Sequence, residues 1–289
     1  MKSLAFVQRN DTHFAVGDFS PVLSVFSYHD LGSTITPFLL LDHIGPGRLI
    51  PSTRSKGVNE HPHRGFETVT IVYEGEIEHR DSTGGGGIIR AGDVQWMTAA
   101  AGIVHRELFS DDFTQRGGRF EMVQLWINLP AADKMGPPGY QSLTRTQIPS
   151  VGLPDATGTV RVIAGQFEGG SGPARTHTRM NVLDVCLHAG HAATFSTGDG
   201  DTALVYLLSG RLQFDQDEPL EAQGLAVLSQ QGADVMVRAL DNSRLLVLTG
   251  ERIDEPINGH GPFVMNSYDE ILQAYDDVKN GRLGPVAGR

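Results

Sequence analysis

The sequence predicts a mostly β protein with two comparable halves, each a β-sandwich or barrel, and one helix near the C-terminus. Most apolar segments are short and end at Gly, Pro, Asp or Asn, and 35 glycines and 15 prolines supply many turns. TVTIVYEGEIEH, from Thr68, and ALVYLLSGRLQF, from Ala203, both read as apolar strand, glycine turn and alternating strand. This short similarity is consistent with two related halves.

The predicted strands are rich in Val, Ile, Thr, Tyr and Phe, and their spacing between turn signals suits a sandwich or barrel. In chain order they are Pro37–Asp42, Glu67–Tyr73, Gly75–His79, Gly87–Arg90, Asp93–Thr98, Phe120–Leu129, Val160–Ala164, Asn181–Leu187, Ala203–Leu208, Arg211–Phe214, Gly224–Leu228, Asp234–Arg238 and Ser243–Thr249.

One segment near the C-terminus has the pattern of a helix. Asn266 or Ser267 can cap it, and Ser267-x-x-Glu270 resembles a capping box, while Gly281 supplies a stop. The expected apolar stripe consists of Ile271, Leu272, Tyr275 and Val278.

A break between the two halves is expected where AADKMGPPGYQSLTRTQIP lacks two-residue alternation and carries turn residues. We therefore expect an N-terminal domain over 1–130, a linker over 131–149, a C-terminal domain over 150–253 and a tail with the helix over 254–289.

Composition narrows the class of protein. Lys and Arg number 23 and Asp and Glu 34, so the net charge of −11 argues against a nucleic-acid partner or an anionic membrane surface. The single cysteine, Cys186, excludes an intrachain disulfide, and its apolar surroundings predict a core position. No secretory or membrane-spanning apolar segment is visible, so we expect a cytoplasmic protein.

Two residue pairs carry the strongest chemical signal: His61 and His63 in EHPHRGFE, and His105 and Glu107 in GIVHRE. Residues i and i+2 of a strand share a face, so each pair can direct two ligands at one point. Such a set suits Fe, Ni, Cu, Mn or Zn, as a catalytic site with open positions or as a closed structural zinc site. Exposed turn histidines are the competing interpretation, because 11 histidines give about 0.4 His-x-His by chance (11 × 11/289).

The other histidines have no comparable partner in the sequence. We expect surface or singly hydrogen-bonded positions for His13, His29, His43, His79, His177, His188, His191 and His260. In FEMVQLWINL, Met122, Gln124 and Trp126 share one face; barrel packing is the simplest interpretation, and lining of a metal site is the alternative.

The joined motifs HPHRGFETVTIVYEGEIEHRDSTG, GDVQWMTAAAGIVHRE and QLWINLP resemble the pirin family of the cupin superfamily. The resemblance extends through PFLLLDH, ARTHT and MNSYDEILQAYDDVKNGRLG, and so covers nearly the whole chain. It implies a bicupin of two antiparallel β-barrels, with the metal in the N-terminal one. The implied ligands are His61, His63, His105 and Glu107. The implied metal is one ion per chain, foremost Fe(II), with Ni, Cu, Mn, Co or Zn as alternatives.

Glu67 lies four residues after His63, where the broader cupin motif places a carboxylate ligand. Pirin-like proteins resemble that motif but use the later glutamate, here Glu107. We therefore expect Glu67 beside the ligands or at the edge of the core.

The second half is expected to lack the metal site. We align Gly75 with Gly210 and Gly92 with Gly224, in a register uncertain by a residue or two. The residues opposite His61, His63, His105 and Glu107 are then Ser196, Gly198, Val237 and Ala239, none of them a good metal ligand.

The resemblance implies a quercetin 2,3-dioxygenase type of activity, which opens a flavonol ring with O2 and releases carbon monoxide. Glu107 would then take the proton of the flavonol 3-hydroxyl as catalytic base. The alternative is a non-catalytic, redox-responsive iron protein that regulates a protein partner, a transcription factor or a metabolic enzyme. A structural zinc barrel is the third interpretation.

Overall fold

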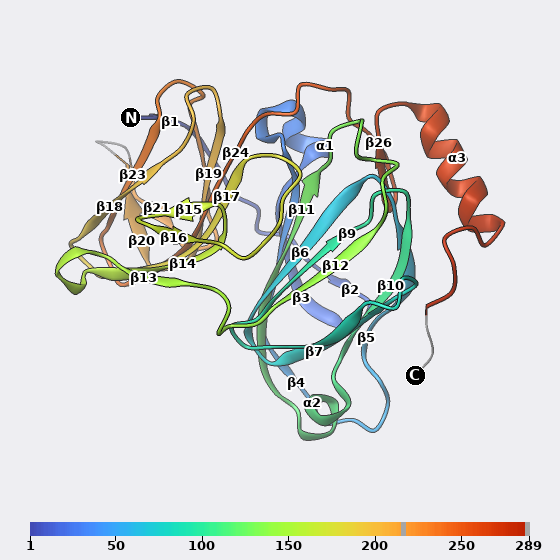
Figure 1. The fold of residues 1–289 in the computed structure, drawn as a ribbon. Coiled ribbons are helices and arrows are strands. Elements are labelled where there is room, and N and C mark those ends of the chain that lie inside the picture. The colour runs from blue at the N-terminus through green and yellow to red at the C-terminus, as the bar shows by residue number, and fades with distance from the viewer. Residues whose placement is uncertain (215–217, 287–289) are drawn as a thin grey trace. The chain divides into compact units, whose positions relative to one another are not determined.

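The computed structural model describes residues 1–214 and 218–286, which form two compact units (Figure 1). The first barrel comprises Asp11–Ser24, Phe38–Arg145 and Asp254–Arg289, and the second barrel comprises Met1–Asn10, Val25–Pro37 and Thr146–Ile253. Both units are discontinuous in sequence, whereas the predicted domains are continuous ranges. Residues 215–217 of the predicted C-terminal domain and 287–289 of the predicted tail lie outside the described residues.

The first barrel is built from two sheets whose order is determined by hydrogen bonding. The larger has the order β12 (Gly139–Leu143), β9 (Val94–Thr98), β6 (Phe66–Glu74), β11 (Gly118–Asn128), β4 (Phe38–Leu49), β3 (Phe19–Ser27) and β2 (His13–Val16). The smaller has the order β5 (Gly57–His63), β10 (Ile103–Phe109), β7 (Glu76–Asp81) and β8 (Gly86–Arg90). This unit also contains a short helix α2 (Asp111–Arg116), the hairpin of β25 (Asn258–His260) and β26 (Phe263–Met265), and helix α3 (Tyr268–Lys279).

The second barrel repeats this arrangement. Its larger sheet has the order β1 (Leu4–Gln8), β22 (Leu225–Leu228), β19 (Thr202–Ser209), β24 (Ser243–Gly250), β17 (Met180–Leu187), β14 (Gly158–Ala164) and β13 (Ser150–Gly152). Its smaller sheet has the order β18 (Ala192–Ser196), β23 (Asp234–Ala239), β20 (Arg211–Gln213) and β21 (Leu220–Glu221). The remaining elements are the hairpin β15 (Gln166–Phe167) and β16 (Gly170–Ser171), helix α1 (Tyr28–Leu31), and the 3₁₀ turns η1 (Gly32–Ile35) and η2 (Pro154–Ala156). The two sheet orders correspond strand for strand, which confirms the predicted antiparallel bicupin.

Every predicted strand is present, and most agree to within one or two residues at each end. The prediction omitted many of the observed strands, including β1, β3 and β18. It also omitted β5 and β10, although it placed their histidine pairs on strands, and β12 lies within the predicted linker. The predicted core position of Cys186 is wrong, because its side chain is exposed on β17.

The helix α3 (Tyr268–Lys279) begins where predicted, with Ser267 as N-cap and a complete capping box to Glu270. Leu272 and Tyr275 of the predicted stripe are exposed instead, at 50% and 41%. The buried cluster consists of Phe263, Met265, Ile271 and Ala274, with Val278 packed against it. Within residues 1–214 and 218–286, no helix is long and apolar enough to cross a membrane.

Lys134 is buried and joins three segments of the first barrel. Its Nζ donates hydrogen bonds to the backbone oxygen of Gly65 at 2.6 Å, to Oδ1 of Asn128 at 2.6 Å and to the backbone oxygen of Val264 at 3.0 Å. An ammonium group has three N–H donors, so this geometry satisfies all of them. The lysine thereby ties the segment that follows His63 to β26.

Arg64 forms a second connection between that segment and the C-terminal part of the chain. Its buried Nη2 lies 2.7 Å from Oδ2 of Asp277 in α3. Arg282 also donates to the Asp277 carboxylate. The hydrogen bond from Arg282, opposed by burial and assisted by Arg64, lowers the pKa of Asp277 from 3.8 to about 2.

We expect Lys134→Met to lower the free energy of unfolding by about 2–4 kcal/mol, because three buried oxygens lose their donor. Urea denaturation followed by circular dichroism measures the change. Lys279→Met, at an exposed position of α3, is the matched control and should change the value by no more than about 0.5 kcal/mol. Equal effects of the two substitutions would contradict a special role for Lys134.

We expect the destabilisation caused by Asp277→Asn to be larger at about pH 5 than at about pH 3. A lowered folded-state pKa means that the carboxylate stabilises the protein above pH 3.8, and that this stabilisation is lost as the pH falls towards 2. Denaturation curves at both pH values test this. Asp276→Asn, whose exposed carboxylate contacts Arg282, is the control, and the same pH dependence there would refute the assignment to Asp277.

Candidate metal centre

The pairing of β5 with β10 brings three predicted histidines together. His61 lies opposite His105 in the ladder, and His63 lies opposite Ile103. The ring centroids are 4.2 Å apart for His61 and His105, 4.8 Å for His61 and His63, and 4.9 Å for His63 and His105. One ligand atom from each imidazole lies within 4.8 Å of the others. We call these residues the three-histidine cluster.

Backbone oxygens orient two of these rings. Nδ1 of His61 lies 2.7 Å from the backbone oxygen of Asn59, and Nδ1 of His63 lies 3.2 Å from that of Pro262. Since a carbonyl only accepts, each Nδ1 donates a proton, which leaves Nε2 as the nitrogen that can bind a metal. Nε2 of His105 is buried and has no hydrogen-bond partner among the described residues.

Burial also keeps two of the imidazoles neutral. Desolvation, assisted by neighbouring His61, lowers the pKa of His63 to about 3. Desolvation, assisted by His63, His61 and His79, lowers the pKa of His105 well below its ordinary value. A neutral imidazole with a free lone pair is the form that binds a metal ion, so the cluster fits a divalent transition metal.

Glu107 lies next to the cluster but belongs to a second group of candidate ligands, together with His79 and His105. Its buried carboxylate accepts hydrogen bonds from Thr70 at 3.2 Å, from Gln124 at 2.9 Å and from Gln95. In the described chain, the two groups share only His105, and neither contains all four predicted ligands. The surrounding hydroxyl and amides hold Glu107 in one orientation beside the imidazoles.

His79 is a residue that sequence reasoning placed wrongly, since it is fully buried and both of its ring nitrogens have a partner, whereas a surface or singly hydrogen-bonded position was expected. Its Nε2 lies 3.1 Å from Oδ2 of Asp81, and its Nδ1 lies 3.3 Å from Nδ1 of His105. The sequence did carry a signal. His79-x-Asp81 has the same two-residue spacing on a strand that identified the other pairs.

Glu67 is buried outside both groups, which is consistent with a position at the edge of the core. Its Oε1 accepts a hydrogen bond of 2.6 Å from Thr98, which lies opposite Glu67 on the paired strand β9. Neither group of candidate ligands in the described residues includes it.

Aromatic side chains border the cluster on one side. Trp126 lies with its ring centroid 5.3 Å from His63 and 4.3 Å from Phe66, and its Nε1 donates to Gln124 at 3.3 Å. Gln124 and Trp126 therefore do lie at the candidate site, whereas Met122 of the same strand packs into the apolar core.

The second barrel shows what replaces the polar cluster. Gly75 and Gly210, both at positive φ, directly precede the corresponding strands β7 and β20. Ile77 lies opposite Phe109, and Leu212 lies opposite Ala239, so Phe109 corresponds to Ala239. The observed strand pairing therefore moves the correspondence between the two barrels by one or two residues from the alignment expected from the sequence.

Counting along these ladders, the residues in place of His61, His79, His105 and Glu107 are Phe195, Phe214, Val235 and Val237. All four replacements belong to the hydrophobic core of the second barrel. Thr197 stands in place of His63. The second barrel has an apolar interior where the first has imidazoles and a carboxylate.

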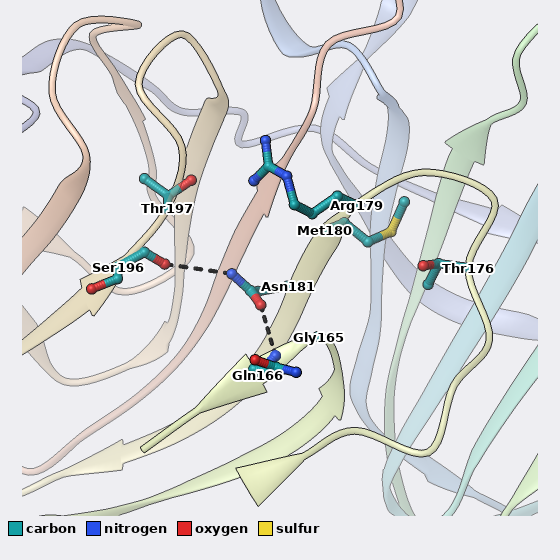
Figure 2. A pocket seen from close by; sticks show the side chains of 8 residues that line it. All are labelled: Gly165, Gln166, Thr176, Arg179, Met180, Asn181, Ser196 and Thr197. Atoms are coloured by element: carbon teal, nitrogen blue, oxygen red, sulfur yellow. Dashed lines mark hydrogen bonds between the residues drawn. The ribbon is translucent and has the colours of Figure 1, made fainter. Parts of the chain in front are cut away.

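The second barrel also has a polar pocket of ≈ 510 Å³, shown in Figure 2. Asn181 links its walls by accepting from the backbone N–H of Gln166 at 2.9 Å and donating to the backbone oxygen of Ser196 at 3.5 Å. Arg179 forms two hydrogen bonds with Asp201, of 2.6 and 2.8 Å. Neither group of candidate metal ligands lies in this pocket.

Comparison with known proteins gives matches over nearly the whole chain. The Pirin family model matches residues 20–127, and the Pirin C-terminal cupin domain model matches residues 182–284. A Pseudomonas aeruginosa protein named "putative quercetin 2,3-dioxygenase" is 51% identical over 98% of this chain and 99% of its own length. Human pirin is 37% identical over 86% of this chain and 83% of its own length.

A solved structure agrees in fold and sequence. The crystal structure of quercetin 2,3-dioxygenase from Acinetobacter baumannii has a TM-score of 0.95 and 45% identity, covering 98% of this chain and 99% of that one. Together with the two family models and the relatives above, this agreement shows that the chain belongs to the pirin family of cupin proteins.

Proposed function

We propose that this protein is a metal-dependent dioxygenase that cleaves a flavonol such as quercetin and releases carbon monoxide. The observation that carries the proposal is the three-histidine cluster, whose His63 and His105 are buried, with a hydrogen-bonded carboxylate beside it. The names of the Pseudomonas and Acinetobacter relatives support the substrate class. The site lies in the barrel that contains most of the predicted N-terminal domain.

The proposed metal ligands are His61, His63, His105 and Glu107. Three imidazole nitrogens and one carboxylate oxygen suit Fe(II), and also accept Ni, Cu, Mn, Co or Zn. The metal, when bound, would lower the pKa of the flavonol 3-hydroxyl and stabilise its anion. One metal per chain follows from the apolar interior of the second barrel.

Glu107 is the proposed catalytic base for the 3-hydroxyl proton. The hydrogen bonds from Thr70, Gln95 and Gln124 fix the direction of its carboxylate, so that it need not reorganise as the proton arrives. Trp126, packed against the buried Phe66, supplies an aromatic face beside His63, against which a flat substrate can pack.

We expect protein reconstituted with Fe(II) to release about one carbon monoxide per quercetin consumed over many turnovers, because ring opening by this route expels one ring carbon. Gas-phase carbon monoxide analysis and quercetin absorbance measure the ratio. His61→Ala, which removes one proposed ligand, should abolish it.

Flavonol loss without carbon monoxide, or equal loss with His61→Ala, would rule out enzymatic cleavage. If the wild-type protein still bound iron at the cluster, the non-catalytic regulator with a protein partner would become the leading function. A metal that is redox-silent and unaffected by substrate would instead indicate a structural zinc site.

We expect Glu107→Gln to lower kcat at least about 100-fold while much of the metal is retained, since an amide cannot take the proton but three histidines remain. Steady-state kinetics and metal content by mass spectrometry test this. Glu67→Gln is the matched control, because it replaces another buried carboxylate of the same barrel that lies outside both ligand groups. Wild-type turnover in Glu107→Gln would remove Glu107 from the mechanism.

A further inference from the structure

His79 and Asp81 form a buried chain of contacts behind the three-histidine cluster. The chain runs from Asp81 Oδ2 to His79 Nε2 over 3.1 Å, and from His79 Nδ1 to His105 Nδ1 over 3.3 Å. The exposed fractions of His79, Asp81 and His105 are 0%, 1% and 0%. Bulk solvent therefore does not reach these three side chains.

Asp81 begins the chain with a fixed orientation. Its Oδ1 accepts from the backbone N–H of Thr83 at 2.8 Å, from the Thr83 hydroxyl at 2.7 Å and from the backbone N–H of Gly85 at 3.0 Å. The other oxygen, Oδ2, is left for His79. A carboxylate bonded in this way can only accept, so His79 must donate from Nε2.

The proton positions of both histidines follow from this constraint. A His79 ring that donates from Nε2 to Asp81 can accept at Nδ1, and His105 then donates to it from its own Nδ1. Nε2 of His105 then carries a lone pair and no proton. The opposite arrangement would bury an N–H at His105 Nε2, where the described residues offer no acceptor.

Tyr140 holds His79 in the required plane. The two rings stack with centroids 4.7 Å apart and an angle of 14° between planes. Tyr140 belongs to β12, the edge strand that pairs with β9. His79 has both ring nitrogens engaged, so this geometry gives it a supporting position and not that of a ligand.

We infer that Asp81 and His79 are positioning residues that fix the proton of His105 on Nδ1 and so prepare its Nε2 to bind the metal. This inference rests on the proposed metal site and adds residues to it. We call Asp81 and His79 the relay. It orients the His105 ring as backbone oxygens orient the rings of His61 and His63. All three rings then present Nε2.

Asp81→Asn tests the relay sharply, because the amide of the new side chain can adopt only one orientation. The donors of Thr83 and Gly85 require an oxygen at their side, so the NH2 group must face His79. His79 would then accept at Nε2 and donate from Nδ1, which moves the His105 proton to Nε2 and removes the lone pair. We expect Ni(II) affinity, measured by chelator competition, to fall about 10- to 100-fold.

Two further variants separate the relay from a general loss of structure. Glu78→Gln is the matched control, since it neutralises another carboxylate of β7 that bonds to Arg80 outside the cluster. In His79→Gln, the glutamine oxygen can accept from His105 without Asp81. Adding Asp81→Asn to that variant should therefore change Ni(II) affinity by no more than about twofold. A tenfold loss in both backgrounds would overturn the relay.

Histidine tautomers provide a readout that does not depend on activity or on any variant. Long-range ¹H–¹⁵N spectra of the metal-free and Zn(II)-loaded full chain should show His105 protonated on Nδ1 and His79 on Nε2. A proton on Nε2 of His105 in the metal-free wild-type protein, or a metal bound to His79, would overturn the inference. If His61→Ala left Ni(II) binding unchanged, the proposed metal site would fail instead, while the metal-free tautomers would still decide the relay.

Discussion

The interior of the first barrel depends on one constraint: polar atoms taken out of water must find partners inside the protein. The barrel buries imidazoles and a carboxylate in a space that its counterpart fills with Phe195, Phe214, Val235 and Val237. Each buried polar group therefore brings further polar groups with it. Glu107 requires Thr70, Gln95 and Gln124, and His79 requires Asp81, which in turn requires the turn at Thr83 and Gly85.

The two barrels together separate what the fold needs from what the candidate site needs. Their sheets have the same strand order, so neither histidines nor a metal are necessary for the architecture. The second barrel has a continuous apolar core in place of the cluster, which contributes stability through burial without a demand for hydrogen bonds. The first barrel has polar side chains in place of this apolar packing at His61, His79, His105 and Glu107, and hydrogen bonds orient their nitrogen and oxygen atoms.

Much of this could be predicted from the sequence because strands with two-residue periodicity and glycine turns leave a local signal. The pairs at His61 and His63 and at His105 and Glu107 rely on that same period, and the ladder brings the three histidines together. His79 was misplaced because its partners, His105 and Tyr140, are distant in sequence and meet it only through strand pairing. The strand containing Tyr140 was predicted as linker because turn residues surround it. It is a strand because its backbone pairs with β9, which its own sequence does not signal. Leu272 and Tyr275 mark the same limit on α3, where the buried residues keep the helical period but the neighbouring hairpin selects which face is buried.

The contact between His63 and Pro262 spans 199 residues of sequence. At synthesis rates of roughly 5–20 residues per second, His63 emerges about 10–40 s before its carbonyl acceptor is made. Arg64 likewise finds its partners late, because its side chain pairs with Asp277 and its backbone oxygen accepts from the N–H of Val264. His63 obtains its acceptor only after the C-terminal hairpin has docked, so the candidate site is completed in the nearly finished chain and not in the nascent barrel.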